Sequence, residues 1–557
     1  MRNKINKYIL SGLLLCMLSS CSDFLEYSES STLNKDLAFS NMERATKVAM
    51  NSYTYLQDNF GGAMRASACD ESQYVWANSI IHRYYNGSWS PFSTIDDQWG
   101  HYYNGIHACN DFLENGADLT FDEYQYSEDF KNAYDNYKML KWEVRALRAF
   151  YHFELVRRYG NIPIVGSTLT PDEANNVKQT PAKEVLQWIA AECQTCYQHL
   201  PETYDIAIPY NKQTGRITKL FAKALESRVL LYGSSPLYND GVYDTEMLRS
   251  SAKASLDVIE IMENDGVSLA NVSYSDLWNS DGDTHAKCPS IISKILRGNS
   301  NGFEQENFPI SVEGGKTGNC PTQNLVDAYD MQRGFTYDPT NPYAHRDERL
   351  EQTIVVNGSQ WAYNNIMDIS YGGVDGLPNR GATPTGYYLK KYAMKNTNLS
   401  PTGTTTHKKI WILFRLGEMY LNYAEAASRI NGASGIDGDL YMSATEAINR
   451  VRARKGLSID PIADGLTLSA FTQKYRKERM VELAFEDHRF WDIRRWMIGS
   501  STATIKTMKI RKSGDSDITY TPEVDNTSRI WNDKFYFYPI NQKEIEVNPN
   551  LIQNTGW

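Results

Sequence analysis

The chain has 557 residues, of which 57 are Lys or Arg and 67 are Asp or Glu, and its formal net charge is −10. This acidic balance argues against a nucleic-acid-binding protein, which normally presents a basic face to the phosphates. An apolar share of 41% with 22% charged residues is typical of a soluble globular protein with a sizeable core, and gives no sign of a disordered or multi-spanning chain. The 37 Tyr residues are a high number for this length and are the first indication of function.

The first 20 residues have the pattern of a secretory signal. Two lysines precede a short apolar run, Tyr8 to Leu18, that is too short to span a bilayer. The run ends in Leu18-Ser19-Ser20-Cys21, which is similar to a bacterial lipobox. We predict a lipoprotein signal peptide over residues 1–20, lipidation of Cys21 and a tether over 21–40, with the membrane reached through the lipid alone. An ordinary secretory signal with an accidental Cys is the alternative.

Apolar residues then recur at spacings of three and four, which predicts helices. The expected helices are Thr94 to Leu113, Glu128 to Tyr159, Pro181 to Leu200, Arg216 to Tyr232, Asp244 to Glu263, Lys409 to Ile430, Ala444 to Lys455 and Leu468 to Trp496. Thr180-Pro181 is a candidate helix start, and Gly160 and Gly456 are candidate stops. Strand signals are few. Adjacent helices of similar length predict a mostly α fold, a TPR-like helical-repeat scaffold with degenerate repeats.

From about 267 to 407 the pattern changes to Gly, Asn, Asp, Pro and aromatic residues without a helical period. We expect a single domain over 41–557, with a helical scaffold over 41–266 and 408–557 and a loop-rich subdomain over 267–407. A structureless stretch of that length is uncommon unless it is functional. Loops on a rigid scaffold commonly carry function, so we expect ligand binding there and in the segment from Trp76 to Pro91.

Conventional catalytic and metal motifs are missing. The sequence has no Gly-x-Ser-x-Gly, His-Glu-x-x-His or phosphate-binding glycine loop. Cys193-x-x-Cys196 lacks a second Cys pair, so we interpret both as buried thiols. Asp281-Gly282-Asp283 lacks the first Asp and the twelfth-position Glu of an EF-hand, and we read it as a turn, although a bound calcium stays open. We expect no metal and no cofactor. A glycosidase needs only two placed carboxylates, so that class stays open.

The C-terminal motifs are the most specific feature. Arg415-Leu-Gly-Glu-Met-Tyr-Leu-Asn-Tyr-Ala-Glu-Ala426 and the run from Glu478 through Glu482, Glu486 and Arg489 to Trp496 resemble two helix signatures of the SusD/RagB family of surface glycan-binding lipoproteins. Tyr159-Gly-Asn-Ile-Pro163 and the ending Asn548-Pro-Asn-Leu-Ile-Gln-Asn-Thr-Gly-Trp557 also look like family landmarks, in the family's order.

The acids and arginines of the second signature are spaced to pair along and between helices. A catalytic cluster of Glu482, Glu486 and Asp492 is the alternative reading. Adjacent arginines would keep such acids ionised, whereas a general acid needs a raised pKa, and we therefore predict structural ion pairs.

A glycan platform needs aromatic rings for the C–H face of a sugar and polar neighbours for its hydroxyls. The segment Asp70-Glu-Ser-Gln-Tyr74-Val-Trp76-Ala-Asn78 has this composition and resembles the family segment whose aromatics bind starch. By that resemblance Tyr74 and Trp76 stack on sugar and Asn78 hydrogen-bonds to it. Further candidates are Tyr84, Tyr85, Trp89, Trp278, Phe303, Trp361 and Tyr363. Any of these rings could instead be core residues. Asn319 stands near a position where the family has another binding aromatic, which argues against a starch-like ligand.

The resemblance implies a non-enzymatic glycan receptor, lipid-anchored on the outer membrane and facing the cell exterior. It also implies a SusC-like TonB-dependent outer-membrane barrel as partner, over which the protein closes as a lid to deliver oligosaccharide or polysaccharide. Two alternatives stay open: a RagB-like receptor of a peptide importer, and a secreted glycoside hydrolase.

Overall fold

The computed structural model describes residues 35–122, 125–126, 129–204, 215–278, 287–514, 517–525 and 529–557. The predicted signal peptide, Cys21 and the Asp281-Gly282-Asp283 turn lie outside these residues. Among the described residues, no helix is both long enough and apolar enough to cross a membrane.

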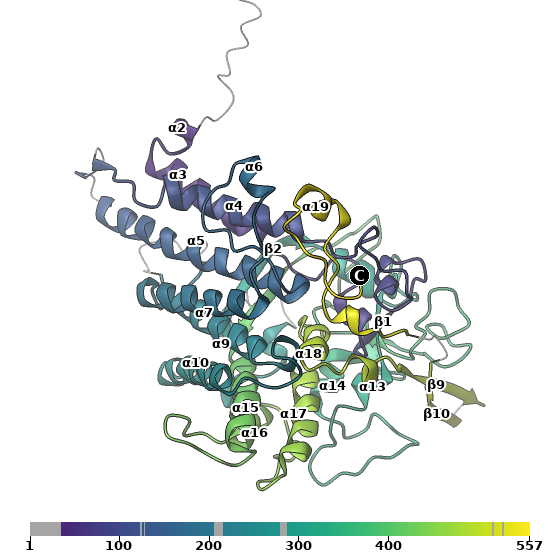
Figure 1. Ribbon diagram of the computed structural model, residues 1–557. Coiled ribbons are helices and arrows are strands. Elements are labelled where there is room, and N and C mark those ends of the chain that lie inside the picture. The colour runs from purple at the N-terminus through teal and green to yellow at the C-terminus, as the bar shows by residue number, and fades with distance from the viewer. Residues whose placement is uncertain are drawn as a thin grey trace, which may run out of the picture.

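A stack of helices forms one side of the molecule (Figure 1). Each helix packs on the next along the chain: α4 on α5, α5 on α7, α7 on α9, α9 on α10, α10 on α15 and α15 on α16. Their bounds are α4 Trp99–Asn115, α5 Phe130–Tyr159, α7 Ala182–His199, α9 Lys219–Gly233, α10 Thr245–Asn264, α15 Leu416–Asn431 and α16 Ala444–Arg452. The mostly α, repeat-like fold predicted from the periodicity is therefore confirmed.

Local chemistry explains several helix ends. The Asp244 side chain caps α10 by accepting the Met247 N–H at 3.0 Å. Gly160 ends α5 with φ 68°, a conformation that favours glycine. Pro181 is the residue before α7 rather than its first residue, because the Thr180 backbone is bridged to Ile162.

The helix predicted from Lys409 to Ile430 is wrong in its first part. His407–Arg415 is strand β8, paired antiparallel with β2 (Ile291–Ser300), and α15 begins only at Leu416. The run from Ile410 to Phe414 is β-branched or aromatic at most positions and buried at every one. When a short apolar run is buried on both faces, periodicity alone does not distinguish a helix from a strand.

The helix predicted from Leu468 to Trp496 is broken into two. α17 ends at Glu482 and α18 spans Arg489–Arg495. Between them Phe485 and Asp487 have φ of 59° and 64°, which no right-handed helix accommodates. The break turns the chain sharply at the centre of the family signature.

Loops, short helices and short strands gather on the other side of the stack (Figure 1). The described residues contain five two-stranded antiparallel sheets. One joins β1 (Ser72–Tyr74) to β3 (Asn319–Pro321), and another is the hairpin of β9 (Lys506–Ser513) and β10 (Asp517–Val524). Residues 267–407 also carry the short helices α12 (Gly302–Asn307), α13 (Gln323–Val326) and α14 (Glu348–Thr353). Few of these strands have a sequence signal, because each is two to ten residues long and pairs with a distant segment.

Buried ion pairs tie the two sides together, as the signature predicted. Glu482 accepts hydrogen bonds from Arg349 at 3.0 Å, Arg415 at 2.7 Å and Arg454 at 2.5 Å. Its neighbour Glu486 accepts from Arg415 at 2.7 Å and from Lys391 at 2.8 Å. All of these side chains are buried.

A second cluster surrounds Glu425 of α15. Its carboxylate accepts two bonds of 2.6 Å from Arg495 and one of 2.6 Å each from Tyr475 and Trp496. Burial by itself would raise the pKa of Glu425, but the Arg495 guanidinium outweighs burial and lowers that pKa to about 2.

We therefore expect Glu425→Gln to lower the free energy of unfolding at pH 7 by about 3–5 kcal/mol, because it removes the carboxylate that binds both terminal nitrogens of buried Arg495 and leaves Asp492 as its one ion-pair partner in the described chain. The folded-state pKa of Glu425 is below its ordinary 4.5, so its stabilisation is present above pH 4.5 and is lost as the pH falls towards 2. The variant should accordingly lose less stability than wild type over this range. Urea titrations at pH 7, 4.5 and 3 measure both effects.

The control is Glu446→Gln, which breaks an exposed pair with Arg450 and should change stability by less than about 1 kcal/mol. Equal losses in the two variants would contradict the account.

Candidate ligand-binding site

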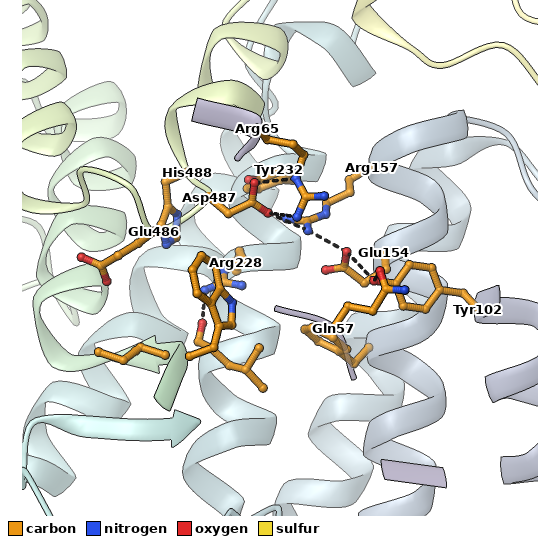
Figure 2. Close-up of a pocket in the computed structure, with 14 residues that line it drawn as sticks. Gln57, Arg65, Tyr102, Glu154, Arg157, Arg228, Tyr232, Glu486, Asp487 and His488 are labelled. Carbon is orange, nitrogen blue, oxygen red and sulfur yellow. Dashed lines mark hydrogen bonds and ion pairs between the residues drawn. The ribbon is translucent and has the colours of Figure 1, made fainter. Parts of the chain in front are cut away.

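The turn between α17 and α18 lines a small buried cavity (Figure 2). Its volume is about 30 Å³, room for no more than a water molecule or two. Asp487 accepts from Arg65 at 2.7 and 2.9 Å and from Arg157 at 3.3 Å, and Glu154 accepts from Arg157 at 2.6 Å. No substrate of sugar size fits into this space.

The electrostatics of this cavity oppose acid–base catalysis. Burial would raise the pKa of Asp487, but Arg65 and Arg157 outweigh it and lower that pKa to about 2. Burial and the surrounding arginines lower the pKa of His488 well below its usual range. A general acid needs a carboxyl that holds its proton near neutral pH, and Asp487 does not. The three acids of the catalytic alternative are likewise held in ion pairs: Glu482 and Glu486 accept from Arg415, and Asp492 accepts from Arg479 at 2.7 Å and from Arg495 at 2.8 Å.

The pKa of the Glu71 carboxyl is shifted in the opposite direction, upwards. Burial raises its pKa to about 8. Its side chain is 1% exposed, and its Oε1 accepts the Phe485 N–H at 2.6 Å. Although its pKa would suit a general acid, no substrate can reach it without unfolding the turn it holds.

Seven of the predicted sugar-binding aromatics are buried, which corrects their assignment. Trp89 is 2% exposed, and its ring centroid lies 4.8 Å from that of Tyr84, 4.9 Å from Tyr538 and 5.0 Å from Trp557. A ring whose faces are covered by other rings offers no surface to a sugar. The seven buried residues are Tyr74, Tyr84, Tyr85, Trp89, Trp278, Phe303 and Trp361.

The contacts of the other buried rings show why they belong to the core. Trp278 lies beneath the Lys391 ammonium, whose Nζ is 3.7 Å from the ring centroid. Phe303 packs edge-on against Phe60 at 5.2 Å. Their neighbours come from distant parts of the chain, so no local sequence signal marks them as buried.

The three remaining predicted residues are placed differently, and Tyr74 lies next to two of them. Trp76 is half-buried, and Asn78 is exposed. The ring of Tyr74 is buried and its hydroxyl is bound to Glu306. Tyr363 is 44% exposed, but its hydroxyl is bound to the Thr397 carbonyl, in a different part of the loop region.

Three loop segments meet at Trp76. Val75 N–H donates to the Gly318 carbonyl at 3.0 Å, which continues the β1–β3 pairing, and Trp76 Nε1 donates to the Lys316 carbonyl at 3.0 Å. From the third segment, Gly381 lies against the indole: a Cβ there would be 3.0 Å from Cη2 of Trp76. The φ of Gly381 is 84°, so this close approach depends on glycine in both space and backbone conformation.

We call this region the Trp76 surface and define it by Trp76, Asn78, Lys316, Arg380 and Gly381. Asn78, Lys316 and Arg380 are exposed. The surface thus combines part of an aromatic ring with an amide and two cations, which can satisfy both the apolar and the hydroxyl groups of a sugar. Sequence reasoning singled out Trp76 and Asn78. It missed Lys316 and Arg380, because only the fold brings their segments to Trp76.

An open polar cleft of about 510 Å³ begins three residues further along the chain, at Ser79 and Ile80. Asp58, Asn59, Gln98 and Arg297 also line it. Ile80 is 54% exposed. None of the five residues that define the Trp76 surface lines this cleft.

Asn319 is a structural residue. Its Oδ1 accepts from Met64 N–H at 2.9 Å and Ser67 Oγ at 3.0 Å, and its Nδ2 donates to Asn307 at 2.9 Å. An aromatic ring at this buried position would break these bonds, so the chain has no platform there.

Comparison with known proteins agrees with this architecture. A family model described as the SusD family matches residues 293–557, and a second, described as starch-binding and associating with the outer membrane, matches residues 23–231. SusD-like protein P2 of Formosa agariphila is 23% identical over 477 residues, 82% of this chain and 79% of the relative.

Solved structures share the fold. A SusD-like protein from Bacteroides fragilis superposes with a TM-score of 0.76 at 24% identity, covering 93% of this chain and 98% of that one. A laminarin-binding SusD-like protein superposes with a TM-score of 0.62 at 21% identity, covering 92% and 99%. These matches define the class as helical carbohydrate-binding proteins associated with the outer membrane. The two models and the relatives together support a SusD-like protein.

Trp76 and Trp89 are buried to different extents, so we predict different losses of stability when each is replaced by Ala. Trp89→Ala should lower the free energy of unfolding by about 3–5 kcal/mol, because it leaves a cavity among packed rings. Trp76→Ala should cost no more than about half as much, because part of its ring already faces solvent. Urea unfolding at pH 7 measures both, with Tyr126→Ala as the control, since that ring is 92% exposed. If Trp76→Ala destabilised the protein as much as Trp89→Ala, Trp76 would be a core residue.

Proposed function

We propose that this protein is a glycan receptor on the outer cell surface, anchored through lipid on Cys21. In this proposal it captures oligosaccharide or polysaccharide and delivers it to a SusC-like TonB-dependent barrel in the outer membrane. The family relationship supports the ligand class and the membrane, and the lipobox-like Leu18-Ser19-Ser20-Cys21 supports the anchor. The Trp76 surface is the single observation that supports a ligand site on this chain.

The physical basis is the match between that surface and a sugar ring. The exposed part of the indole offers an apolar face for sugar C–H groups. Asn78 can donate and accept hydrogen bonds, and the Lys316 and Arg380 cations can donate to hydroxyl oxygens. The β1–β3 pairing and the Gly381 contact hold the indole in place before a ligand arrives, which reduces the entropy lost on binding.

We further propose that the protein is not an enzyme. The buried carboxylates of Glu482, Glu486 and Asp487 have lowered pKa values, and the cavity that Glu486 and Asp487 line is too small for a sugar. Binding without turnover also suits a receptor, because hydrolysis at the surface would release its ligand before transport.

Isothermal titration with laminarin oligosaccharides, and with other neutral and acidic oligosaccharides, tests this proposal. The name of the laminarin-binding structural relative suggests the first probe. We expect saturable binding that Trp76→Ala weakens at least about fivefold, or about 1 kcal/mol, with no product formed. Tyr126→Ala is the matched control, because it removes an exposed ring elsewhere and should leave affinity unchanged.

Equal affinity in the two variants would show that Trp76 is not in the site. If no oligosaccharide bound while peptides did, the peptide-receptor alternative would replace the glycan proposal. Release of shortened oligosaccharides would show an enzyme.

A further inference from the structure

A separate pocket of about 300 Å³ lies away from the Trp76 surface, between α4, the segment from 163 to 177 and the C-terminal residues 544–551. Figure 1 shows α4, α6 (Pro171–Ala174) and α19 (Gln542–Val547) close together at this place. The apolar lining is Trp99, Tyr103, Val165, Leu169, Val547 and Leu551. Its size is at the lower end of the range for small-ligand pockets.

The walls of this pocket are fastened to each other. Asn548 Nδ2 donates to the Val177 carbonyl at 2.9 Å, and Asn550 Nδ2 donates to the Asn176 carbonyl at 2.9 Å. Ile552 N–H donates to Gln179 Oε1 at 2.9 Å. On the opposite wall, the Tyr103 hydroxyl donates to the Pro163 carbonyl at 2.9 Å. The pocket therefore exists without a ligand and does not depend on closure.

Polar side chains at the pocket are free to bind. Asn104, His107, Asn175 and Glu544 line it, and within the described part of the chain none of their side chains makes a hydrogen bond. The first three are exposed. Partial burial and the nearby Asp97 raise the pKa of Glu544. An apolar wall beside unpaired amides, an imidazole and a carboxyl favours a ligand with one apolar side and several hydroxyl groups.

We propose that this pocket binds one neutral sugar ring, as a subsite distinct from the Trp76 surface. The inference rests on the proposed function for its ligand class, glycan. Its position and its lining are independent of Trp76. The apolar wall would take the C–H face of the ring, while Asn104, His107, Asn175 and Glu544 would take its hydroxyls. With two subsites, one protein can hold a branched or long glycan at two points, which raises the overall affinity.

Gly100 permits a clean test. It lies on α4, lines the pocket and is exposed, and a Cβ there would meet nothing within 4 Å. Gly100→Phe should therefore fill the pocket without disturbing the fold, and replacing a helical glycine also favours the helix. Ser250→Phe, on the exposed face of α10, is the matched control.

The probes are glucose, galactose, mannose, N-acetylglucosamine and laminaritriose, added to protein labelled with 5-fluorotryptophan. The Trp99 fluorine resonance, assigned by its loss in Trp99→Phe, reports on the pocket. We expect at least one probe to shift this resonance saturably in wild type and Ser250→Phe, and Gly100→Phe to weaken that binding about tenfold or more. The subsite proposal is wrong if no probe shifts the Trp99 resonance, or if Gly100→Phe binds as tightly as wild type.

Trp76→Ala separates this inference from the function proposed above. Oligosaccharide binding that depends on Trp76 but never shifts Trp99 would support the receptor and reject the subsite. A Trp99 shift sensitive to Gly100→Phe, with oligosaccharide affinity unaffected by Trp76→Ala, would support the subsite and reject the Trp76 surface.

Discussion

The fold depends on the buried carboxylate of Glu482, which binds three guanidinium groups from three separate parts of the chain. Arg349 comes from α14, Arg415 from the end of β8 and Arg454 from the segment after α16. Removing a charge from water is costly, and only several well-placed counter-charges offset that cost. Because the partners of Glu482 come from both the helices and the loop region, this one site requires the two parts to form together.

The same constraint reaches the Trp76 surface through the turn that follows α17. Phe485 N–H binds Glu71, and Arg489 of α18 binds Asp70 through two bonds of 2.9 and 2.7 Å. Asp70 and Glu71 directly precede β1, which leads to Trp76. The signature motif thus fixes the strand from which the Trp76 loop extends, and under the proposed function it would support the binding surface indirectly.

The sequence indicates the helices well, because each has a long amphipathic or buried period and recognisable ends. It does not indicate β8, since Ile410 to Phe414 is as compatible with a helix, and it does not indicate the break at Phe485 and Asp487. The local composition also does not predict that Trp89 is buried while Trp76 is partly exposed. The rings that cover Trp89 include Tyr538 and Trp557, more than 400 residues away. Trp76 packs partly against the core and meets the backbone of Lys316 and Gly381. Burial of an aromatic residue is set by such distant partners, and a local pattern carries no trace of them.

Hydrogen–deuterium exchange with and without a saturating laminarin oligosaccharide tests the central claim, that a rigid ion-paired scaffold presents the Trp76 surface to a glycan. The account predicts slower exchange in residues 72–80, 310–318 and 375–384 when the ligand is bound. It also predicts unchanged, already slow exchange in residues 478–495, whose amides lie within the buried ion-paired core. Protection centred on 478–495, with none in the three loop segments, would contradict the account and move the site into the signature itself.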